Sequence, residues 1–292
     1  MDRSLLEALS ALPPLSKNEF HKLSKKCKIC GAESHFFDTI DFNRFCSFPP
    51  EQNEFGYAFG LANISVPYVR CVYCGFLFTC FFDSWSHDDF KQYIYNDDYI
   101  KVDPEYVSLR PLGWANLFSE LLASVKDLRI LDYGSGAGVF EETMNSFGYK
   151  NVSSYDPFSS TTRPTGRFDI ITCIEVIEHT TDPSGTLDDM LNFLNPGGIV
   201  ILSQLMQPEN IKIIGGRWWY LGPRNGHISA YTTIALAQLA AQKGYQLRGQ
   251  GNCWSIVPVH INPVFTPILD RIGPYHPPGP PFMASPASEN AR

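Results

Sequence analysis

Two Cys-x-x-Cys pairs are the residues of this sequence whose type and spacing imply chemistry most directly. The first pair is Cys27 and Cys30, the second is Cys71 and Cys74, and a glycine follows each pair. A turn with this spacing aims two thiolates at one point, and the glycine lets the chain bend so that backbone N–H groups face the sulfurs. Because two such turns supply four sulfur ligands, the spacing predicts a structural Zn²⁺ site.

Disulfide bonds or a redox dithiol are the alternatives for these cysteines. Residues 1–20 contain no uninterrupted apolar stretch of the kind found in a secretory leader, which favours reduced thiols and predicts a cytoplasmic protein. Two glycine-followed copies without a thioredoxin-like context disfavour the redox role. Cys46 and Cys80 are expected to be small buried hydrophobic residues instead of ligands.

A glycine-rich segment follows the apolar run that ends at Asp132. Gly134, Gly136 and Gly138 separate this expected strand from an expected helix, so the backbone can approach a ligand closely while helix N–H groups point at it. Asp156 ends the next strand, 24 residues after Asp132, where a carboxylate can accept both hydroxyls of a ribose. An NAD fingerprint needs a glycine where this chain has a valine, so the pattern fits a dinucleotide poorly.

Two carboxylates and an imidazole follow a further apolar strand. Glu175, Glu178 and His179 would share one face of a helical turn, because their spacing is i, i+3 and i+4. At the carboxyl end of a parallel strand they would face the ligand crevice. Taken alone, the pattern indicates either a His179 general base oriented by a carboxylate or a structural turn.

Residues 204–231 are expected to form a substrate lid. Glycines within the segment permit movement, Trp218 and Trp219 offer flat walls, and Arg217 or Arg224 could meet a phosphate or a carboxylate. The alternative is that the tryptophans belong to the core, which is common for this residue type.

The composition allows the chain to position these groups in a folded core. Of its 292 residues, 44% are apolar and 14% aromatic, which excludes wholesale disorder. A formal net charge of −7 argues against broad nonspecific binding to nucleic acid or to an anionic membrane. No window approaches eighteen consecutive apolar residues, so we expect no membrane span.

Changes in sequence pattern divide the chain. The first third holds six of the eight cysteines and leads into a tyrosine-dense run ending at Tyr99, which either packs two modules together or overhangs a substrate cleft. From Trp114 onward, strand and helix patterns alternate, which predicts an α/β fold with a parallel sheet. We predict four parts: an N-terminal segment 1–22, a zinc-binding module 23–100, a nucleotide-type α/β domain 101–262 and a Pro-rich flexible tail 263–292.

The second module resembles the class I S-adenosylmethionine-dependent methyltransferases. Their first motif, D-x-G-x-G-x-G, stands at residues 132–138, and the segments 167–179 and 194–203 resemble the fourth strand with its turn and the L-x-P-G-G-x strand of that family. The resemblance implies a Rossmann-like fold and S-adenosylmethionine as cofactor. The residues it assigns to the cofactor are Asp132, Gly134, Gly136, Gly138, Asp156 and Glu175.

The same resemblance implies two alternative roles for Glu175, Glu178 and His179. Glu175, Glu178 and His179 stand as in the ubiquinone-biosynthesis and small-RNA 2′-O-methyltransferases, in which this segment binds a divalent cation; the RNA enzymes add a later histidine, here His227. This similarity implies Mg²⁺ or Mn²⁺ on those four residues. The similarity to zinc-containing sugar C-methyltransferases implies instead that His179 acts as a base without a metal.

We therefore predict an S-adenosylmethionine-dependent methyltransferase with a structural zinc. Its acceptor is expected to be a small molecule or a sugar conjugate, methylated on oxygen in preference to carbon. Sugar C-methylation, RNA 2′-O-methylation and a noncatalytic zinc-containing binding protein are the alternatives, and the acidic charge disfavours nucleic acid.

Overall fold

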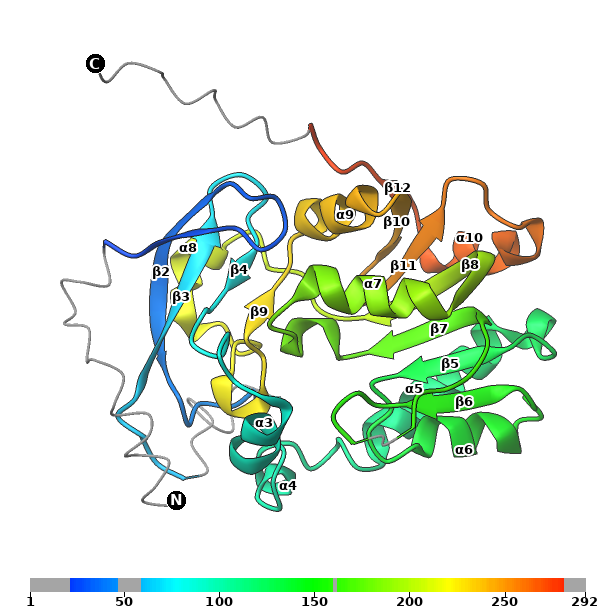
Figure 1. The fold of residues 1–292 in the computed structure, drawn as a ribbon, viewed down its shortest axis with the longest axis horizontal. Coiled ribbons are helices and arrows are strands. Elements are labelled where there is room, and N and C mark those ends of the chain that lie inside the picture. The colour runs from blue at the N-terminus through cyan, green and yellow to red at the C-terminus, as the bar shows by residue number, and fades with distance from the viewer. Residues whose placement is uncertain (1–21, 47–58, 160–161, 281–292) are drawn as a thin grey trace.

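The computed structural model describes residues 22–46, 59–159 and 162–280. Two β-sheets dominate these residues, a seven-stranded sheet on the right of Figure 1 and a five-stranded sheet on the left. The predicted segment 1–22 falls almost wholly outside the described residues, as does the part of the predicted tail beyond residue 280.

The seven-stranded sheet has the order β12-β10-β11-β8-β7-β5-β6. The pairs β6–β5, β5–β7 and β7–β8 are parallel, whereas β11 runs antiparallel between β8 and β10. Its strands are β5 (Ile130–Tyr133), β6 (Val152–Tyr155), β7 (Phe168–Ile174), β8 (Leu194–Ser203), β10 (Tyr245–Gln250), β11 (Cys253–Pro258) and β12 (Tyr275–His276). This mixed sheet confirms the predicted Rossmann-like α/β fold class.

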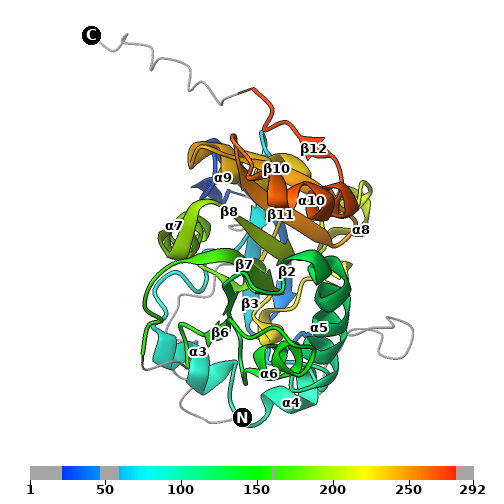
Figure 2. The same ribbon diagram turned by 90° about the vertical axis from the view of Figure 1, so that its right-hand side faces the viewer.

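Helices cover both faces of this sheet because its central strands are apolar on both sides. Leu131 and Ile171 belong to one core cluster with helices α7 and α9, while their chain neighbours Ile130 and Ile170 belong to another with α5, α6 and α10. The helices are α5 (Leu109–Leu121), α6 (Val139–Ser146), α7 (Pro183–Phe193), α9 (Thr233–Gln242) and α10 (Thr266–Ile272). Figure 2 shows the two helical layers on either side of the sheet.

The five-stranded sheet combines four strands from the first third of the chain with one strand from its second half. Its order is β1 (Ser24–Lys26), β2 (Glu33–Asp41), β3 (Ser65–Cys71), β4 (Leu77–Phe78) and β9 (Ser229–Ala230), all paired antiparallel. Strand β9 comes from the segment that we expected to be a lid. Residues 220–231 are buried almost throughout, so the prediction of a movable lid over 204–231 is wrong for this part: the segment is a packed strand and turn.

Short helices connect the sheets. Helix α3 (His87–Tyr93) begins with a capping box in which Ser86 and Asp89 satisfy each other's backbone N–H groups. Helix α4 (Tyr99–Val102) follows it, and both lie beside the lower end of the five-stranded sheet in Figure 1. The remaining short elements are η2 (Ala123–Val125), η3 (Ile177–His179), α8 (Ile211–Ile214), η4 (Gly215–Arg217), η5 (Pro223–Asn225) and η6 (Pro263–Phe265).

The prediction of a flexible tail over residues 263–292 is wrong for its first half, which is folded. Helix α10 packs Ile268, Leu269 and Ile272 into the core behind the sheet, and β12 pairs with β10. Apolar residues at helical spacing outweighed the high proline content, because Pro263 and Pro267 stand in the first turns of η6 and α10, where proline is tolerated. Within the described ranges, no helix combines the length and apolar character that a membrane span needs.

Candidate active site

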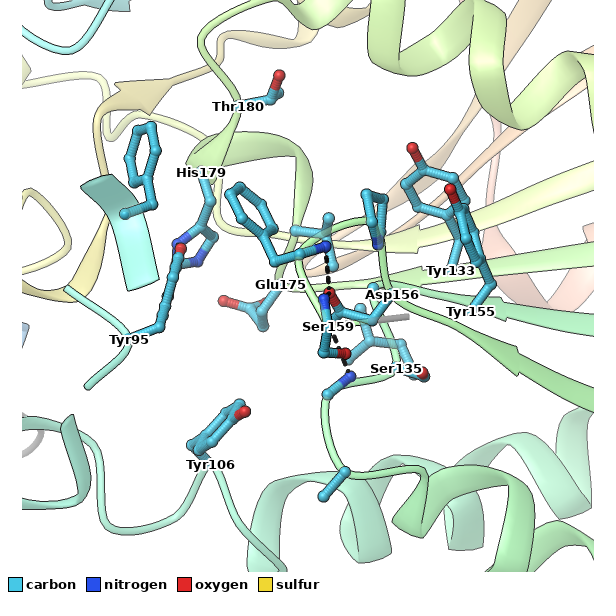
Figure 3. Close-up of a pocket in the computed structure, with 18 of the residues that line it drawn as sticks. Tyr95, Tyr106, Tyr133, Ser135, Tyr155, Asp156, Ser159, Glu175, His179 and Thr180 are labelled. Carbon is cyan, nitrogen blue, oxygen red and sulfur yellow. Dashed lines mark hydrogen bonds between the residues drawn. The ribbon is translucent and has the colours of Figure 1, made fainter. Parts of the chain in front are cut away.

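A cavity of about 1080 Å³ opens at the carboxyl ends of the parallel strands β5, β6 and β7. Ligands of open α/β sheets bind at this edge, since the loops that follow the strands diverge there. The lining includes five of the six residues predicted to bind the cofactor, and also His179. The five are Asp132, Gly134, Gly136, Asp156 and Glu175. Glu175 lies between Asp156 and His179 (Figure 3).

The glycine loop requires glycine at its first position. Gly134 has φ +81°, and a Cβ there would stand 2.4 Å from a methyl carbon of Val176. Gly138, with φ +78°, precedes α6 as its N-cap and is not part of the cavity lining. The loop therefore turns tightly from β5 into α6 and leaves backbone N–H groups at the helix start near the cavity.

Asp156 is held at the end of β6 by backbone N–H groups. Oδ2 accepts a hydrogen bond from the Gly136 N–H at 3.0 Å, and Oδ1 accepts from Phe158 and Ser159 at 2.8 and 3.2 Å (Figure 3). These bonds orient the carboxylate beside the glycine loop, which is the arrangement expected for a ribose-binding acid.

Asp132 lies beneath the loop and is 4% exposed. Thr172 donates a hydrogen bond to Oδ1 at 2.9 Å, and burial raises the pKa of Asp132 to about 7. An acid whose pKa is raised by folding binds more protons in the native state, so it stabilises the fold less as pH rises from its unfolded pKa toward 7.

We expect Asp132→Asn to become relatively more stable than the wild type as pH increases. Asparagine keeps the acceptor for Thr172 but carries no buried charge, and a three-unit shift corresponds to at most about 4 kcal/mol above pH 7. Urea unfolding at pH 5 and pH 8 measures the difference. If the free energy of unfolding of the variant does not rise relative to that of the wild type between pH 5 and pH 8, Asp132 ionises freely in the folded protein.

The two glutamates share one tyrosine. Glu175, whose φ of +52° is unusual for this residue type, accepts hydrogen bonds from Ser203 Oγ at 2.7 Å and Tyr220 Oη at 2.9 Å. Tyr220 Oη also lies 2.5 Å from Oε1 of Glu178, which is fully buried. Burial and the neighbouring Glu175 raise the pKa of Glu178 well above its usual range. Only Glu178 and His179 belong to the helical turn η3, so the expected i, i+3, i+4 face does not form.

Two histidines and a carboxylate converge next to the cavity. Possible ligand atoms of Glu178, His179 and His227 lie within 4.8 Å of one another, and the two imidazole rings are 4.6 Å apart. His179 lines the cavity, and its Nδ1 is 3.0 Å from the Tyr95 hydroxyl. Burial lowers the pKa of both imidazoles, that of His179 well below its usual range and that of His227 to about 4. Both rings are therefore neutral near pH 7.

Glu178, His179 and His227 have the donor atoms of a cation site. Oε2 of Glu178 is buried without a hydrogen-bond partner among the described residues, which suits a metal ligand. One carboxylate and two imidazoles suit a transition-type divalent ion better than Mg²⁺, which prefers oxygen ligands. Glu175 is not part of this group, so the predicted set of four does not converge.

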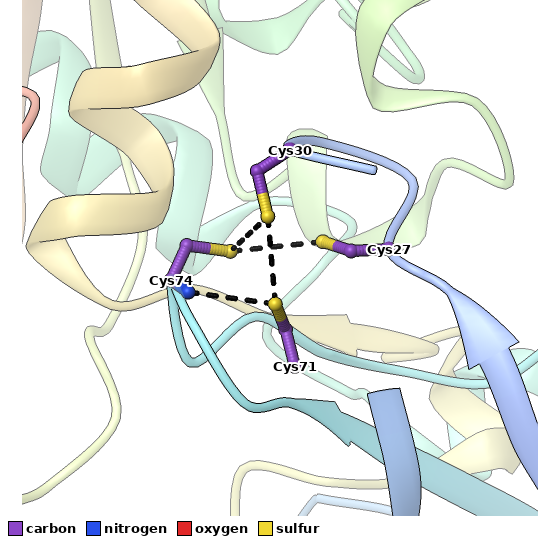
Figure 4. A group of neighbouring side chains, drawn as sticks. All are labelled: Cys27, Cys30, Cys71 and Cys74. Carbon is purple, nitrogen blue, oxygen red and sulfur yellow. Dashed lines mark hydrogen bonds between the residues drawn. The ribbon is translucent and has the colours of Figure 1, made fainter. Parts of the chain in front are cut away.

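The predicted cysteine ligands do converge (Figure 4). Sγ of Cys30 lies 3.5 Å from that of Cys71 and 3.6 Å from that of Cys74, which is also 3.6 Å from Cys27. A tetrahedral Zn²⁺ with Zn–S distances of about 2.3 Å needs sulfurs about 3.8 Å apart. Backbone N–H groups at 3.4 Å face the sulfurs of Cys27 and Cys71. The cluster is thus compatible with zinc, and Cys46 and Cys80 lie outside it.

Of the residues predicted to bind substrate, Tyr99 lines the cavity and the other four do not. Arg224 is 4% exposed, and its guanidinium donates to the Ile94 carbonyl at 2.6 Å and to Asn96, so it ties η5 to the end of α3. Trp218 is buried in the core, Trp219 packs against that core, and Arg217 is exposed. The phosphate contact predicted for Arg224 and the flat wall predicted for Trp218 are therefore wrong, because both side chains are buried in packing. The roles predicted for Arg217 and Trp219 stay predictions.

The cavity also contains residues that sequence reasoning missed. Tyr95 and Tyr106 line it from the connection between α3 and α5, Arg110 from the first turn of α5, and Phe158 from the loop after β6. The tyrosine-dense run around Tyr95 was the available signal. The position of this run over the cavity depends on the turn between α3 and α4, and no sequence motif predicts that turn.

Residues 106–250 match the family model of the methyltransferase domain. The chain carries an S-adenosylmethionine-dependent methyltransferase domain. The match covers about half of the 292 residues and begins after the cysteine cluster. The strand order agrees with a methyltransferase domain. An antiparallel strand, β11, is inserted between β8 and β10 at one edge of an otherwise parallel core.

Curated relatives of this domain are O-methyltransferases. The ubiquinone biosynthesis O-methyltransferase of Psychrobacter arcticus is 30% identical over 105 residues, which cover 34% of this chain and 38% of that protein. The corresponding protein of Bordetella avium is 28% identical over 162 residues, covering 44% of this chain and 67% of its own. The chain thus spans between about two fifths and two thirds of these two relatives.

Two methyltransferases are among the solved structures that match part of this chain. The 1,6-didemethyltoxoflavin-N1-methyltransferase of Burkholderia thailandensis is 14% identical, with a TM-score of 0.40, and the match covers 59% of this chain and 84% of that one. The magnesium protoporphyrin IX methyltransferase of Synechocystis is 14% identical, with a TM-score of 0.38, covering 61% and 96%.

Proposed function

We propose that this protein transfers the methyl group of S-adenosylmethionine to an oxygen atom of a small-molecule acceptor. The observation that carries the proposal is that a single cavity has the glycine loop and Asp156 on one side and His179 on the other. Transfer needs this arrangement, because the acceptor must approach the methyl group in line. The curated relatives named O-methyltransferases favour oxygen as the methylated atom.

The cofactor side would be built by residues of β5, β6 and the loops after them. Asp156, oriented by three backbone N–H groups, would accept the ribose hydroxyls, and the loop through Gly134 and Gly136 would carry the amino-acid end. S-adenosylmethionine supplies an electrophilic methyl group when it is bound. The chain's own task is then to orient the acceptor and to remove its proton.

His179 is the group that we propose as the base. Its ring lines the cavity and its depressed pKa keeps it unprotonated at neutral pH, ready to accept a proton from an acceptor hydroxyl. A hydrogen bond to the backbone at Asn225 favours the protonated ring that results. Glu175 and Glu178, held by Tyr220, would orient this corner of the cavity.

A second chemistry is favoured by the unpartnered Oε2 of Glu178. If Glu178, His179 and His227 hold a divalent cation, that ion would lower the pKa of an acceptor hydroxyl. The two chemistries respond differently to chelation: turnover that survives EDTA while zinc stays bound supports the base. Turnover restored only by Mn²⁺ or a similar ion supports the cation site.

We also propose that the four cysteines hold one structural Zn²⁺. A structural zinc site has four protein ligands and keeps no position open for substrate. The cysteine cluster matches this description, because it offers four sulfurs, is mostly buried and has N–H···S contacts. The zinc would fix the two turns against each other and so the edge of the five-stranded sheet.

Calorimetric titration with S-adenosylhomocysteine tests the cofactor assignment. We expect saturable binding of one equivalent, weakened about 10- to 100-fold in Asp156→Asn, because hydrogen bonds to a charged group contribute about 1.5–3 kcal/mol. Asp188→Asn is the matched control, since this exposed acid on α7 pairs with Lys243 outside the cavity. Absence of binding by the wild type would support the noncatalytic alternative and overturn the enzyme.

A further inference from the structure

One wall of the cavity is built almost entirely of aromatic rings. We call it the acceptor wall; it consists of Trp85, Phe90, Tyr95, Tyr99, Tyr106 and His179. Figure 3 shows Tyr95 and His179 on the side of the cavity opposite Ser135 and Asp156, with Glu175 between them. Tyr106 reaches from the wall to the glycine loop, because a Cβ on Gly136 would stand 3.2 Å from its hydroxyl oxygen. If the cofactor occupies the side of Asp156, the acceptor meets this wall.

The rings of the acceptor wall brace one another. Tyr99 stands edge-on to both Tyr95 and Tyr106, with centroids 5.2 Å away in each case. Two of the hydroxyl groups are already used, that of Tyr95 on His179 and that of Tyr99 on the Asn225 carbonyl. What such a wall offers a ligand is therefore flat apolar surface, which suits a planar ring.

Each arginine that lines the cavity forms an ion pair with an aspartate. Arg110 makes a two-pronged ion pair with Asp103, both N···O distances being 2.8 Å, and Asp103 is 7% exposed. Arg163 is paired with Asp189 and lies over the rings of Tyr155 and Phe193. A forked guanidinium–carboxylate pair leaves little of the arginine for a second anion.

Carboxylates dominate the remaining charge of the lining. Glu175 lies between the two sides of the cavity and accepts hydrogen bonds from the neutral hydroxyls of Ser203 and Tyr220. Asp156 and Asp182 also line the cavity, whereas the lining lysine, Lys91, is exposed on α3. An acceptor with a phosphate or carboxylate would bring a like charge beside Glu175 in a partly buried place, which is unfavourable.

We infer that the acceptor is a planar aromatic compound that is uncharged or cationic, bound with its ring on the acceptor wall. This inference rests on the proposed function and narrows it. Nucleotide-activated sugar conjugates and RNA, both of which carry phosphate, are disfavoured as acceptors by the paired arginines and by Glu175.

Three phenols that differ mainly in charge test the inference: tyramine, 4-ethylphenol and 4-hydroxyphenylacetate. Each is titrated calorimetrically into the zinc-loaded protein saturated with S-adenosylhomocysteine. We expect tyramine and 4-ethylphenol to bind at least about 10-fold more tightly than 4-hydroxyphenylacetate. Equal or tighter binding of the anion, or binding of none of the three, would overturn the inference. Failure of S-adenosylhomocysteine itself to bind would instead overturn the proposed function.

A variant tests whether the ion pair between Arg110 and Asp103 sets the preferred charge of the acceptor. Asp103→Asn removes the charge that neutralises Arg110, so it is expected to raise the affinity for 4-hydroxyphenylacetate relative to 4-ethylphenol by about 10-fold. Asp98→Asn is the control, because that exposed acid pairs with Lys101 on the surface of α4. S-adenosylhomocysteine binding reports that each variant is folded. An unchanged ratio in a folded Asp103→Asn would show that Arg110 does not govern the acceptor's charge.

Discussion

Replacing Cys30 and Cys74 together by serine is expected to remove zinc from the protein and to unfold both halves of the chain at once. Cys27, Cys71 and Cys74 lie in the same core cluster as Leu131 of β5 and Leu236 of α9. Binding of a structural zinc contributes about 10–16 kcal/mol in small zinc domains, so its loss would be as large as the whole 5–15 kcal/mol that stabilises an ordinary domain.

Direct contacts explain why the damage should reach the active site. Lys28, within the first Cys-x-x-Cys turn, donates a hydrogen bond to the carbonyl of Thr181 at 3.0 Å, and Thr181 lines the cavity. Thr232 donates to the Cys74 carbonyl, and the Gln242 side chain donates to the Ile29 carbonyl at 2.7 Å. The cysteine turns are therefore fastened to the methyltransferase domain.

Metal analysis and thermal unfolding measure the outcome. We expect one zinc per wild-type chain, none in the double variant, and loss of its cooperative unfolding transition and of S-adenosylhomocysteine binding. Cys46→Ser with Cys80→Ser is the matched control, because these two thiols come from the same third of the sequence but stand outside the cluster. A Cys30/Cys74 variant that keeps full zinc would prove the ligand assignment wrong.

His179→Ala is expected to lower kcat by about 10²- to 10⁴-fold, the usual contribution of a general base, while S-adenosylhomocysteine still binds within a few-fold of the wild-type affinity. The separation follows from geometry: His179 is on the acceptor wall, and the glycine loop and Asp156 are on the opposite side. Single-turnover methyl transfer with an accepted phenol measures the rate, and calorimetry measures the cofactor.

The pH profile adds a second readout. Since folding lowers the pKa of His179, its unprotonated form persists as pH falls, and the acid limb of kcat/KM should lie below the usual imidazole range. His35→Ala, on the exposed part of β2, is the control. A His179→Ala variant that retains wild-type kcat would exclude this residue as the base.

Local patterns were sufficient for much of the architecture. The strand expected to end at Asp132 is β5 at Ile130–Tyr133, and the helix expected after the glycines is α6 at Val139–Ser146. These elements are encoded by runs of neighbouring residues: apolar strand residues, glycines that permit a tight turn, and a helix start. The same holds for the cysteine turns, whose ligand spacing is a property of four consecutive residues.

Contacts between distant segments could not be predicted in this way. No pattern near Glu178 indicates that Tyr220, 42 residues later, joins it to Glu175. Likewise, the sequence around Arg224 looks suited to an anion, and only the packing of η5 against the end of α3 commits its guanidinium to a carbonyl. Such outcomes depend on which surfaces meet, because hydrogen-bond partners are chosen by burial and not by sequence distance.

The sequence by itself thus determined the α/β class, the glycine loop with Asp156 beside it, and the four cysteines that converge. The tertiary structure alone decided that residues 220–231 are packed as a strand and turn, that α10 belongs to the core, and that Tyr95, Tyr106 and Arg110 line the cavity. The physical reason is the range of the interactions. A turn or a helix start is stabilised by residues a few positions apart, whereas a cavity wall exists only after separate elements have packed together.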